Sequence, residues 1–182
     1  MVKKESQKLS ALSFQTVQEL PCHSVQAESM IRNLYKMQIS KSVSQTHKIA
    51  DNLLKNLANA NLLCLYGELG AGKTTFVQGL AKSLGIKKRV ISPTFVMMRE
   101  YPIIANSQLL IVNFLYHIDL YRIESEKDAI SLNLKELWSG SNNLVIIEWA
   151  EKIKKILPKK RIDVKFSYVS QNKRKISIIH RH

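Results

Sequence analysis

One eight-residue segment constrains the fold of this chain more than any other feature. Residues 67–74 read Gly-Glu-Leu-Gly-Ala-Gly-Lys-Thr and fill every fixed position of the phosphate-binding loop G-x-x-x-x-G-K-[ST]. Glycines let the backbone bend so that successive N–H groups point at a phosphate, and no Cβ atom blocks its approach. In such a loop Lys73 reaches the β- and γ-phosphates, and the hydroxyl of Thr74 is a ligand of Mg²⁺.

The residues on both sides of this loop have the pattern that the loop requires. Residues 62–66 are a short apolar run with the length of a buried strand, and Gly85 stands where a residue just past a helix belongs. Between them, apolar residues recur at helical spacing at Phe76, Val77, Leu80, Ala81 and Leu84. A strand, a glycine loop and a helix in this order place the helix N-terminus against the phosphates. We therefore predict that the chain binds a nucleoside triphosphate.

Length and composition indicate a single globular domain. The chain has 182 residues, of which 45% are hydrophobic, enough for a substantial core. The longest apolar run, residues 109–116, is interrupted by Asn113 and is far shorter than the roughly 18 residues of a membrane span. The first residues lack the apolar segment of a secretory signal, and Cys22 and Cys64 have no metal-binding spacing. We expect a cytoplasmic protein without a membrane partner.

The expected domain begins near residue 41. Residues 1–40 are weakly patterned, and we interpret them as a partly disordered N-terminal extension outside the core, with the P-loop domain over 41–182. A helix capped by Ser42 or Ser44 follows, with Ile49, Leu53, Leu54 and Leu57 on its apolar face. The other expected elements are extended segments over 90–101 and 109–121 that form a hairpin, a weak helix over 126–138, a strand over 144–147, a short basic helix over 151–157 stopped by Pro158, and a C-terminal hairpin of 162–169 and 175–180.

Three further segments carry side chains suited to phosphate chemistry. Glu148 follows the apolar run 144–147, where a carboxylate at a strand end can hold Mg²⁺ directly or through water. The hydroxyls of Ser92 and Thr94 are candidates for contact with the γ-phosphate or with metal-bound water. Asp119 lies in the run 117–122, which alternates polar and apolar residues, and is a candidate for orienting the attacking water. Taken singly, each of the Ser92–Thr94 and 117–122 segments is at least as typical of an ordinary turn or strand as of a phosphate site.

Together these segments resemble the bacterial TsaE (YjeE) family, the small ATPases of tRNA threonylcarbamoyladenosine synthesis. The resemblance covers about residues 42–180 and rests on four motifs in order, which are the loop 67–75, Ser-Pro-Thr-Phe at 92–95, His-Ile-Asp-Leu-Tyr-Arg at 117–122 and Ile-Glu-Trp-Ala-Glu at 147–151. It implies an α/β fold of the P-loop NTPase type, with a central, mostly parallel sheet flanked by helices and antiparallel hairpin additions. Residues 1–40 are additional to this pattern, and residues 102–110 are a somewhat long connection.

The resemblance also implies a set of site residues, with ATP and Mg²⁺ as cofactors. Thr74 and Glu148 hold the metal, and Lys73, Asp119 and Glu148 form the hydrolytic centre. The start of the first helix, over 43–46, touches the nucleotide, and so does a basic residue of the last hairpin, for which Arg174 fits best and Asn172 or Lys175 are alternatives. The expected nucleotide contacts are Thr46, Gly67, Glu68, Leu69, Gly70, Ala71, Gly72, Lys73, Thr74, Thr75, Thr94 and Arg174.

The implied function is that of an ATPase subunit. It works with the transferase pair TsaD and TsaB, and through that complex with tRNA, when the threonylcarbamoyl group is formed on adenosine 37 of tRNAs that read codons beginning with A. Two alternatives stay open. One is a small-molecule P-loop kinase, although the chain shows no arginine pair suited to a kinase lid. The other is a nucleotide-binding, RNA-interacting protein, which the net charge of +14 and the basic C-terminal third favour, unless those lysines are only a solvated surface.

Overall fold

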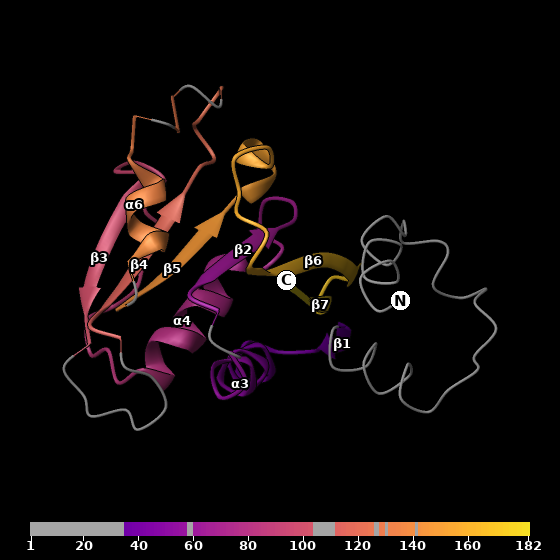
Figure 1. The fold of residues 1–182 in the computed structure, drawn as a ribbon. Helices are drawn as coiled ribbons and strands as arrows, with labels where there is room; N and C mark the ends of the chain where they lie inside the picture. The colour runs from indigo at the N-terminus through magenta and orange to yellow at the C-terminus, as the bar shows by residue number, and fades with distance from the viewer. Residues whose placement is uncertain (1–34, 58–59, 104–111, 126–127, 130, 141) are drawn as a thin grey trace, which may run out of the picture. The chain divides into compact units, whose positions relative to one another are not determined.

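The fold is built around one mixed seven-stranded β-sheet (Figure 1). The computed structural model describes residues 35–57, 60–103, 112–125, 128–129, 131–140 and 142–182. Its strands are β1 (Tyr35–Ser40), β2 (Leu62–Tyr66), β3 (Met98–Pro102), β4 (Phe114–Asp119), β5 (Asn143–Glu148), β6 (Arg161–Ser170) and β7 (Lys173–Arg181). They lie in the order β1-β7-β6-β2-β5-β4-β3, so β2, which leads into the phosphate-binding loop, is central.

The four central strands are parallel and the outer strands are antiparallel. Strands β6, β2, β5 and β4 pair in parallel, while β3 is added to one side and β7 and β1 to the other. Central parallel strands are buried on both faces, which explains the continuous apolar runs of β2 and β5. The predicted α/β class, with a parallel centre and antiparallel hairpin additions, is confirmed.

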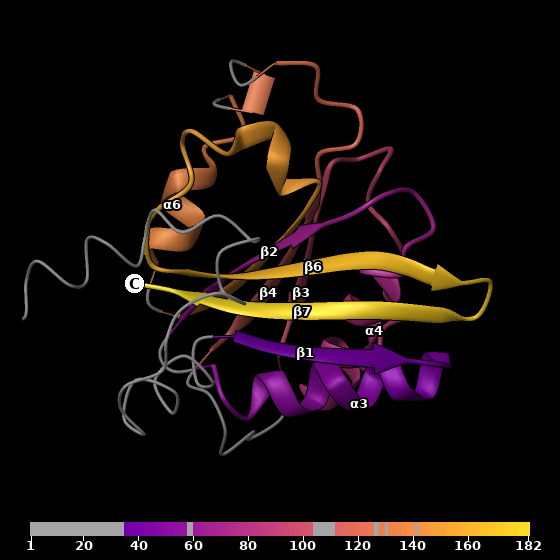
Figure 2. The same cartoon turned by 90° about the vertical axis from the view of Figure 1, so that its right-hand side faces the viewer.

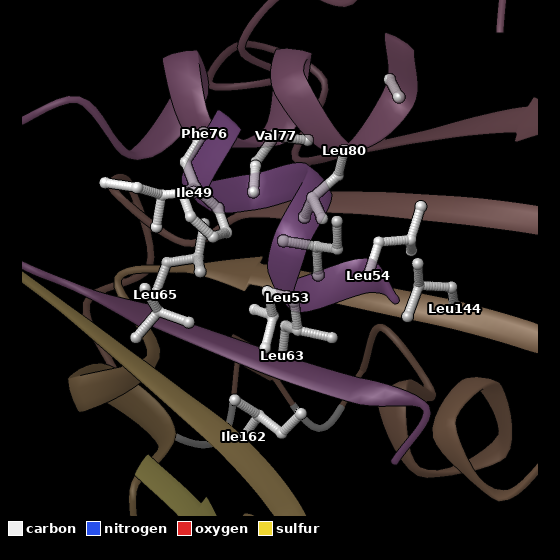
Figure 3. Packing of buried hydrophobic residues seen from close by; sticks show 14 of the residues in the cluster. Ile49, Leu53, Leu54, Leu63, Leu65, Phe76, Val77, Leu80, Leu144 and Ile162 are labelled. Atoms are coloured by element: carbon white, nitrogen blue, oxygen red, sulfur yellow. The ribbon is translucent and has the colours of Figure 1, made fainter. Parts of the chain in front are cut away.

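Helices cover both faces of this sheet. Helices α3 (Val43–Leu54) and α4 (Lys73–Ser83) pack on one face against Leu63 and Leu65 of β2, as Figure 3 shows. The intervening β2 residues Leu62 and Cys64 point to the other face, where α6 (Leu134–Ser139) and the 3₁₀ helix η2 (Ala150–Ile153) lie. Within the described part of the chain, no helix is both long enough and apolar enough to cross a membrane.

The predicted start of α3 and the predicted end of α4 are confirmed, whereas Leu57, expected on the first helix, lies beyond its last residue, Leu54. The Ser42 side chain accepts a hydrogen bond from the Gln45 N–H at 3.2 Å and so caps α3. Helix α4 follows the loop directly, and its last turn is closed by Gly85, which has φ +74° and donates its N–H to the Lys82 carbonyl. Local polar residues and glycines therefore determine where both helices start or stop.

The prediction that residues 1–40 lie outside the core is wrong for residues 35–40. They form β1, which pairs with β7 from Tyr35 opposite Ile179 to Ser40 opposite Arg174 (Figure 2). An edge strand needs hydrogen bonds to only one neighbour, and Met37 and Ile39 of β1 remain 53% and 44% exposed. The strand thus lacks the buried apolar pattern by which a sequence reveals a core strand. The rest of the expected extension, residues 1–34, lies outside the described residues.

Three other predicted elements differ from the structure. Residues 90–97 form a loop with a turn, and the strand begins only after Met97, whose φ of +61° is incompatible with extended backbone. The short helix expected over 151–157 is the four-residue η2 followed by turns. In the described part of the segment 126–138, residues 128–129 and 134–138 are helical and residues 131–133 form a turn. The two expected hairpins, β3 with β4 and β6 with β7, are confirmed.

Candidate nucleotide-binding site

The loop between β2 and α4 has the backbone that its glycines predict. Gly67 has φ +139°, and a Cβ atom added there would lie 2.6 Å from the carbonyl oxygen of Phe166 on β6. Gly72, the residue before α4, has φ +101°, and the α4 ladder begins with the Phe76 N–H donating to its carbonyl at 3.0 Å. Both positions require glycine, and the free N–H groups of the first turn of α4 are left for an anion.

Lys73 is buried beneath the loop. It is 4% exposed, and its Nζ donates to the carbonyl oxygens of Gly67 at 2.5 Å and Glu68 at 3.0 Å. The same Nζ lies 3.8 Å from the ring centroid of Trp149. Burial lowers the pKa of the Lys73 ammonium, and the nearby carboxylates, Glu148 foremost, oppose that shift. The ammonium is therefore held by neutral groups that an incoming phosphate can replace.

A cavity of about 350 Å³ opens on one side of this loop. Its walls bring together residues from the loop, from α4, and from the ends of β4 and β5, which are remote in sequence but adjacent in the sheet. The lining residues are Leu69, Gly70, Ala71, Gly72, Lys73, Thr74, Thr75, Ser92, Thr94, Asp119, Tyr121, Glu148 and Trp149. We call it the phosphate-side cavity.

Thr74 and Glu148 meet at this cavity in an arrangement that fits a magnesium ion. The Thr74 hydroxyl donates to the two carboxylate oxygens of Glu148 at 2.9 and 3.2 Å. Mg²⁺ prefers oxygen ligands and usually keeps water and substrate phosphates among them. Among the described residues no group of three or more His, Cys, Asp or Glu side chains forms a metal site. The donor set therefore suits a cation that is shared with a bound phosphate.

Asp119 is held in place by the loop that precedes β3. The hydroxyls of Ser92 and Thr94 both donate to its Oδ2 at 2.5 Å, and the backbone N–H of Tyr121 donates to its Oδ1 at 2.9 Å. The carboxylate is 3% exposed yet lines the cavity. Ser92 and Thr94, expected near the γ-phosphate, thus contact Asp119 in this structure and connect the loop to it.

A second cavity of about 340 Å³ lies on the other side of the loop, and we call it the nucleoside-side cavity. It combines the β1–α3 junction, the phosphate-binding loop and the β6–β7 turn. Its lining residues are Ser40, Lys41, Ser42, Val43, Thr46, Gly70, Gly72, Thr75, Gln171, Asn172 and Arg174. Gly70, Gly72 and Thr75 line both cavities, so one elongated ligand can extend from one to the other.

The structure brings Thr46 and Arg174 together in this second cavity. Thr46 is 6% exposed, and its hydroxyl lies 2.8 Å from that of Ser40, the last residue of β1. Arg174 Nη1 donates to the carbonyl oxygens of Ser170 at 3.0 Å and Gln171 at 2.9 Å. The alternative Asn172 lines the cavity beside Arg174, whereas Lys175 is not among its lining residues.

Tyr168 on β6 connects the C-terminal hairpin to the loop. Its hydroxyl donates to the Leu69 carbonyl at 2.8 Å, and the Arg174 guanidinium lies 4.2 Å from its ring centroid. Tyr168 belongs to none of the sequence motifs, because nothing in a solvated strand end marks a tyrosine as a neighbour of a loop about a hundred residues earlier.

The expected site residues thus gather around one loop, and their roles remain predictions. Gly67 and Glu68 line neither cavity and contribute their carbonyls to Lys73 instead. Two contacts were not anticipated. His117 lies beneath Glu148, with Nε2 2.8 Å from Oε1, and Trp149 has φ +60° and covers Lys73. The sequence signal for His117 was its position two residues before Asp119, on the same side of a strand.

Trp149 should report nucleotide binding by its fluorescence. Its ring lies over the Lys73 ammonium and 5.2 Å from the Tyr121 ring, so a phosphate that draws Lys73 away changes its surroundings. Trp138, in contrast, is packed in the core cluster around α6. In a Trp138→Phe background we expect ATP to change the emission at saturable concentrations. Lys73→Ala in the same background is the control and should show no such change, and an unresponsive parent would place Trp149 outside the reach of the ligand.

A family model and the curated relatives of this chain both identify one family. Residues 40–176 match the model of the family described as "Threonylcarbamoyl adenosine biosynthesis protein TsaE". The chain is 37% identical over 145 residues to a tRNA threonylcarbamoyladenosine biosynthesis protein TsaE of Rickettsia felis, covering 79% of each chain. It is 39% identical over 117 residues to that of Bacillus subtilis, covering 64% of this chain and 68% of the relative. The fold is similar to the crystal structure of Bacillus subtilis YdiB, with a TM-score of 0.63 and 30% identity over 81% of this chain and 86% of that one.

Proposed function

Because this chain belongs to the TsaE family, we propose that it is a Mg²⁺-dependent ATPase acting in the formation of tRNA threonylcarbamoyladenosine. The observation that carries the ATPase proposal is the convergence of Lys73, Thr74, Asp119 and Glu148 on the phosphate-side cavity, at the N-terminus of α4. This convergence combines a cation, a hydroxyl and two carboxylates around the position where a helix N-terminus binds phosphate.

Each of these side chains has a distinct part in the proposed hydrolysis. Lys73 exchanges its carbonyl partners for the β- and γ-phosphate oxygens and offsets their charge. Thr74 and Glu148 would hold Mg²⁺, which would neutralise negative charge on the phosphates. Asp119, kept in place by three donors, orients a water for attack on the γ-phosphorus. The nucleoside lies on the other side of the loop, between Thr46 and Arg174.

The proposed ATPase works as a subunit with TsaD and TsaB, and contacts tRNA through them. Fast hydrolysis needs positive charge at the transition state beyond that of a P-loop lysine, and no arginine is among the described residues that line the phosphate-side cavity. Leu69 lines that cavity and is 71% exposed, and Phe95 and Val96, which directly follow the lining residue Thr94, are 81% and 55% exposed. An apolar rim of this kind is typical of a surface that another protein covers. A partner docked there is in a position to supply the charge.

The test is phosphate release by the isolated chain and by its mixture with TsaD and TsaB. We expect slow release alone and stimulation of roughly tenfold or more in the mixture, since charge supplied in trans accelerates related phosphoryl transfers by at least about 10³. Asp119→Ala should blunt this stimulation while ATP binding persists, with Asp51→Ala, at a half-buried aspartate of α3 that lines neither cavity, as the control. Equal rates with and without partners would favour a free-standing enzyme, and phosphate transfer to a small acceptor would favour a kinase.

A further inference from the structure

A buried histidine lies directly behind the proposed metal ligand. His117 is 0% exposed, and its Nε2 is 2.8 Å from Oε1 of Glu148, which is itself 3% exposed. The two residues come from neighbouring parallel strands, His117 from β4 and Glu148 from the last position of β5. Register places Asp119 opposite Glu148, so His117 is one pleat further from the cavity on the same face. The imidazole therefore supports the carboxylate from the side away from the phosphate-side cavity.

The chemistry of the two side chains indicates which atom donates in the His117–Glu148 hydrogen bond. A carboxylate only accepts, so the proton of this hydrogen bond belongs to Nε2 of the histidine. The other ring nitrogen, Nδ1, is buried and has no hydrogen-bond partner among the described residues. Nε2 is therefore assigned as the atom that donates to Glu148.

Two side chains hold the Glu148 carboxylate, and only one of them is itself an expected metal ligand. In this structure the Glu148 carboxylate is held by the Thr74 hydroxyl on one side and by His117 on the other. A hydroxyl that ligates a metal uses a lone pair and keeps its hydrogen for a carboxylate. Thr74 is thus shared between Glu148 and the expected cation, whereas His117, which is not among the residues that line the phosphate-side cavity, is committed to Glu148.

We propose that His117 is a positioning residue for Glu148, which it holds in the rotamer that presents the carboxylate to a divalent cation on the nucleotide. This inference rests on the proposed Mg²⁺-nucleotide function and deepens it. The last torsion of a glutamate is intrinsically broad, so an unsupported carboxylate samples orientations that face away from Thr74. Hydrogen bonds from surrounding side chains to metal-binding groups raise metal affinity by restricting such motion.

The alternative is that His117 is only a packed core residue. Neighbouring β3 shows that this face tolerates buried polar atoms, since Arg99 Nε and Tyr101 OH are also buried without a hydrogen-bond partner among the described residues. Tyr101, opposite Leu115 of β4, lies further from the cavity than His117. A packing role predicts that replacing His117 lowers stability and leaves cation affinity alone. Tyr101→Phe therefore serves as the matched control for the loss of a buried polar atom.

The experiment measures Mn²⁺ affinity in the complex of the full chain with a non-hydrolysable ATP analogue, by electron paramagnetic resonance. Two variants remove the donor, His117→Leu and His117→Asn, whose amide is too short to reach Glu148. His117→Gln keeps a donor near the position of Nε2. We expect the first two to weaken Mn²⁺ binding about tenfold or more. We expect His117→Gln to stay within about threefold of the parent and Tyr101→Phe to equal it. Affinity for the analogue in EDTA should be unchanged throughout.

Each outcome has a single reading. If the donor-free variants that fold bind Mn²⁺ as the parent does, or if His117→Gln is no better than His117→Asn, the positioning role is wrong while the proposed function stands. If the parent itself does not bind Mn²⁺ with the analogue, the proposed function is wrong. Thermal unfolding of each variant separates a loss of fold from a loss of cation affinity, and His117→Asn keeps a polar side chain at this site in case His117→Leu does not fold.

Discussion

Replacing Lys73 with alanine is expected to abolish productive ATP binding. The ammonium is the one cation that the phosphate-binding loop directs at the β- and γ-phosphates, and each hydrogen bond between charged groups contributes about 1.5–3 kcal/mol. Losing two such bonds corresponds to a weakening of at least about 100-fold, which isothermal titration with ATP and Mg²⁺ would measure. Hydrolysis should fall below detection in the same variant.

The matched control for this variant is Lys82→Ala. Lys82 lies in the last turn of the same helix, is exposed and lines neither cavity, so its loss removes an equal charge without touching the site. Because Lys73 also bonds the loop carbonyls of Gly67 and Glu68, the comparison needs unfolding curves for both variants. Normal ATP affinity and hydrolysis in a folded Lys73→Ala chain would defeat the assignment of the loop.

The second large effect is expected at Glu148, where Glu148→Gln should remove metal-dependent hydrolysis and spare nucleotide binding. The amide has nearly the same shape as the carboxylate but lacks the charge that holds a divalent cation. We expect at least a roughly 100-fold loss of phosphate release at saturating Mg²⁺, with near-parental affinity for ATP in EDTA. Glu136→Gln, on the exposed side of α6, is the control. Equal activity at matched Mg²⁺ would mean that the metal-binding carboxylate lies elsewhere.

The parts of the fold that local chemistry determines are predictable from the sequence. The apolar run of β2, the glycines of the loop and the periodicity of α4 are each confined to a few neighbouring residues, so a single pass along the chain finds them. Strand β1 is different, because its side chains stay largely exposed and its place depends on a β7 that follows much later. The positive φ of Trp149 is not predictable from the sequence for a related reason. A φ of +60° at tryptophan follows from tertiary packing and not from local preference.

The site residues likewise fall into those that local sequence reveals and those that only tertiary contacts reveal. Loop residues and Glu148 are recognisable by themselves, because each belongs to a contiguous motif with a chemical reason for its spacing. Thr46 and Arg174 meet only because β1, β7 and the loop converge, and resemblance to a family was the sole route to them. The hydrogen bonds from His117 to Glu148 and from Tyr168 to Leu69 depend on strand register, which the residues alone do not reveal.

Because β1 pairs with β7, the residues of the two cavities become available at different stages of synthesis. Every residue that lines the phosphate-side cavity precedes residue 150, so a growing chain contains all of them well before β7 is made. The nucleoside-side cavity instead joins residues 40–46 to residues 171–174, a contact of high sequence separation that forms slowly. During synthesis β1 cannot pair until β7, the last strand of the chain, has been made. All residues of the phosphate-side cavity are therefore present earlier in synthesis than those of the nucleoside-side cavity, which is complete only after residues 171–174 have been added.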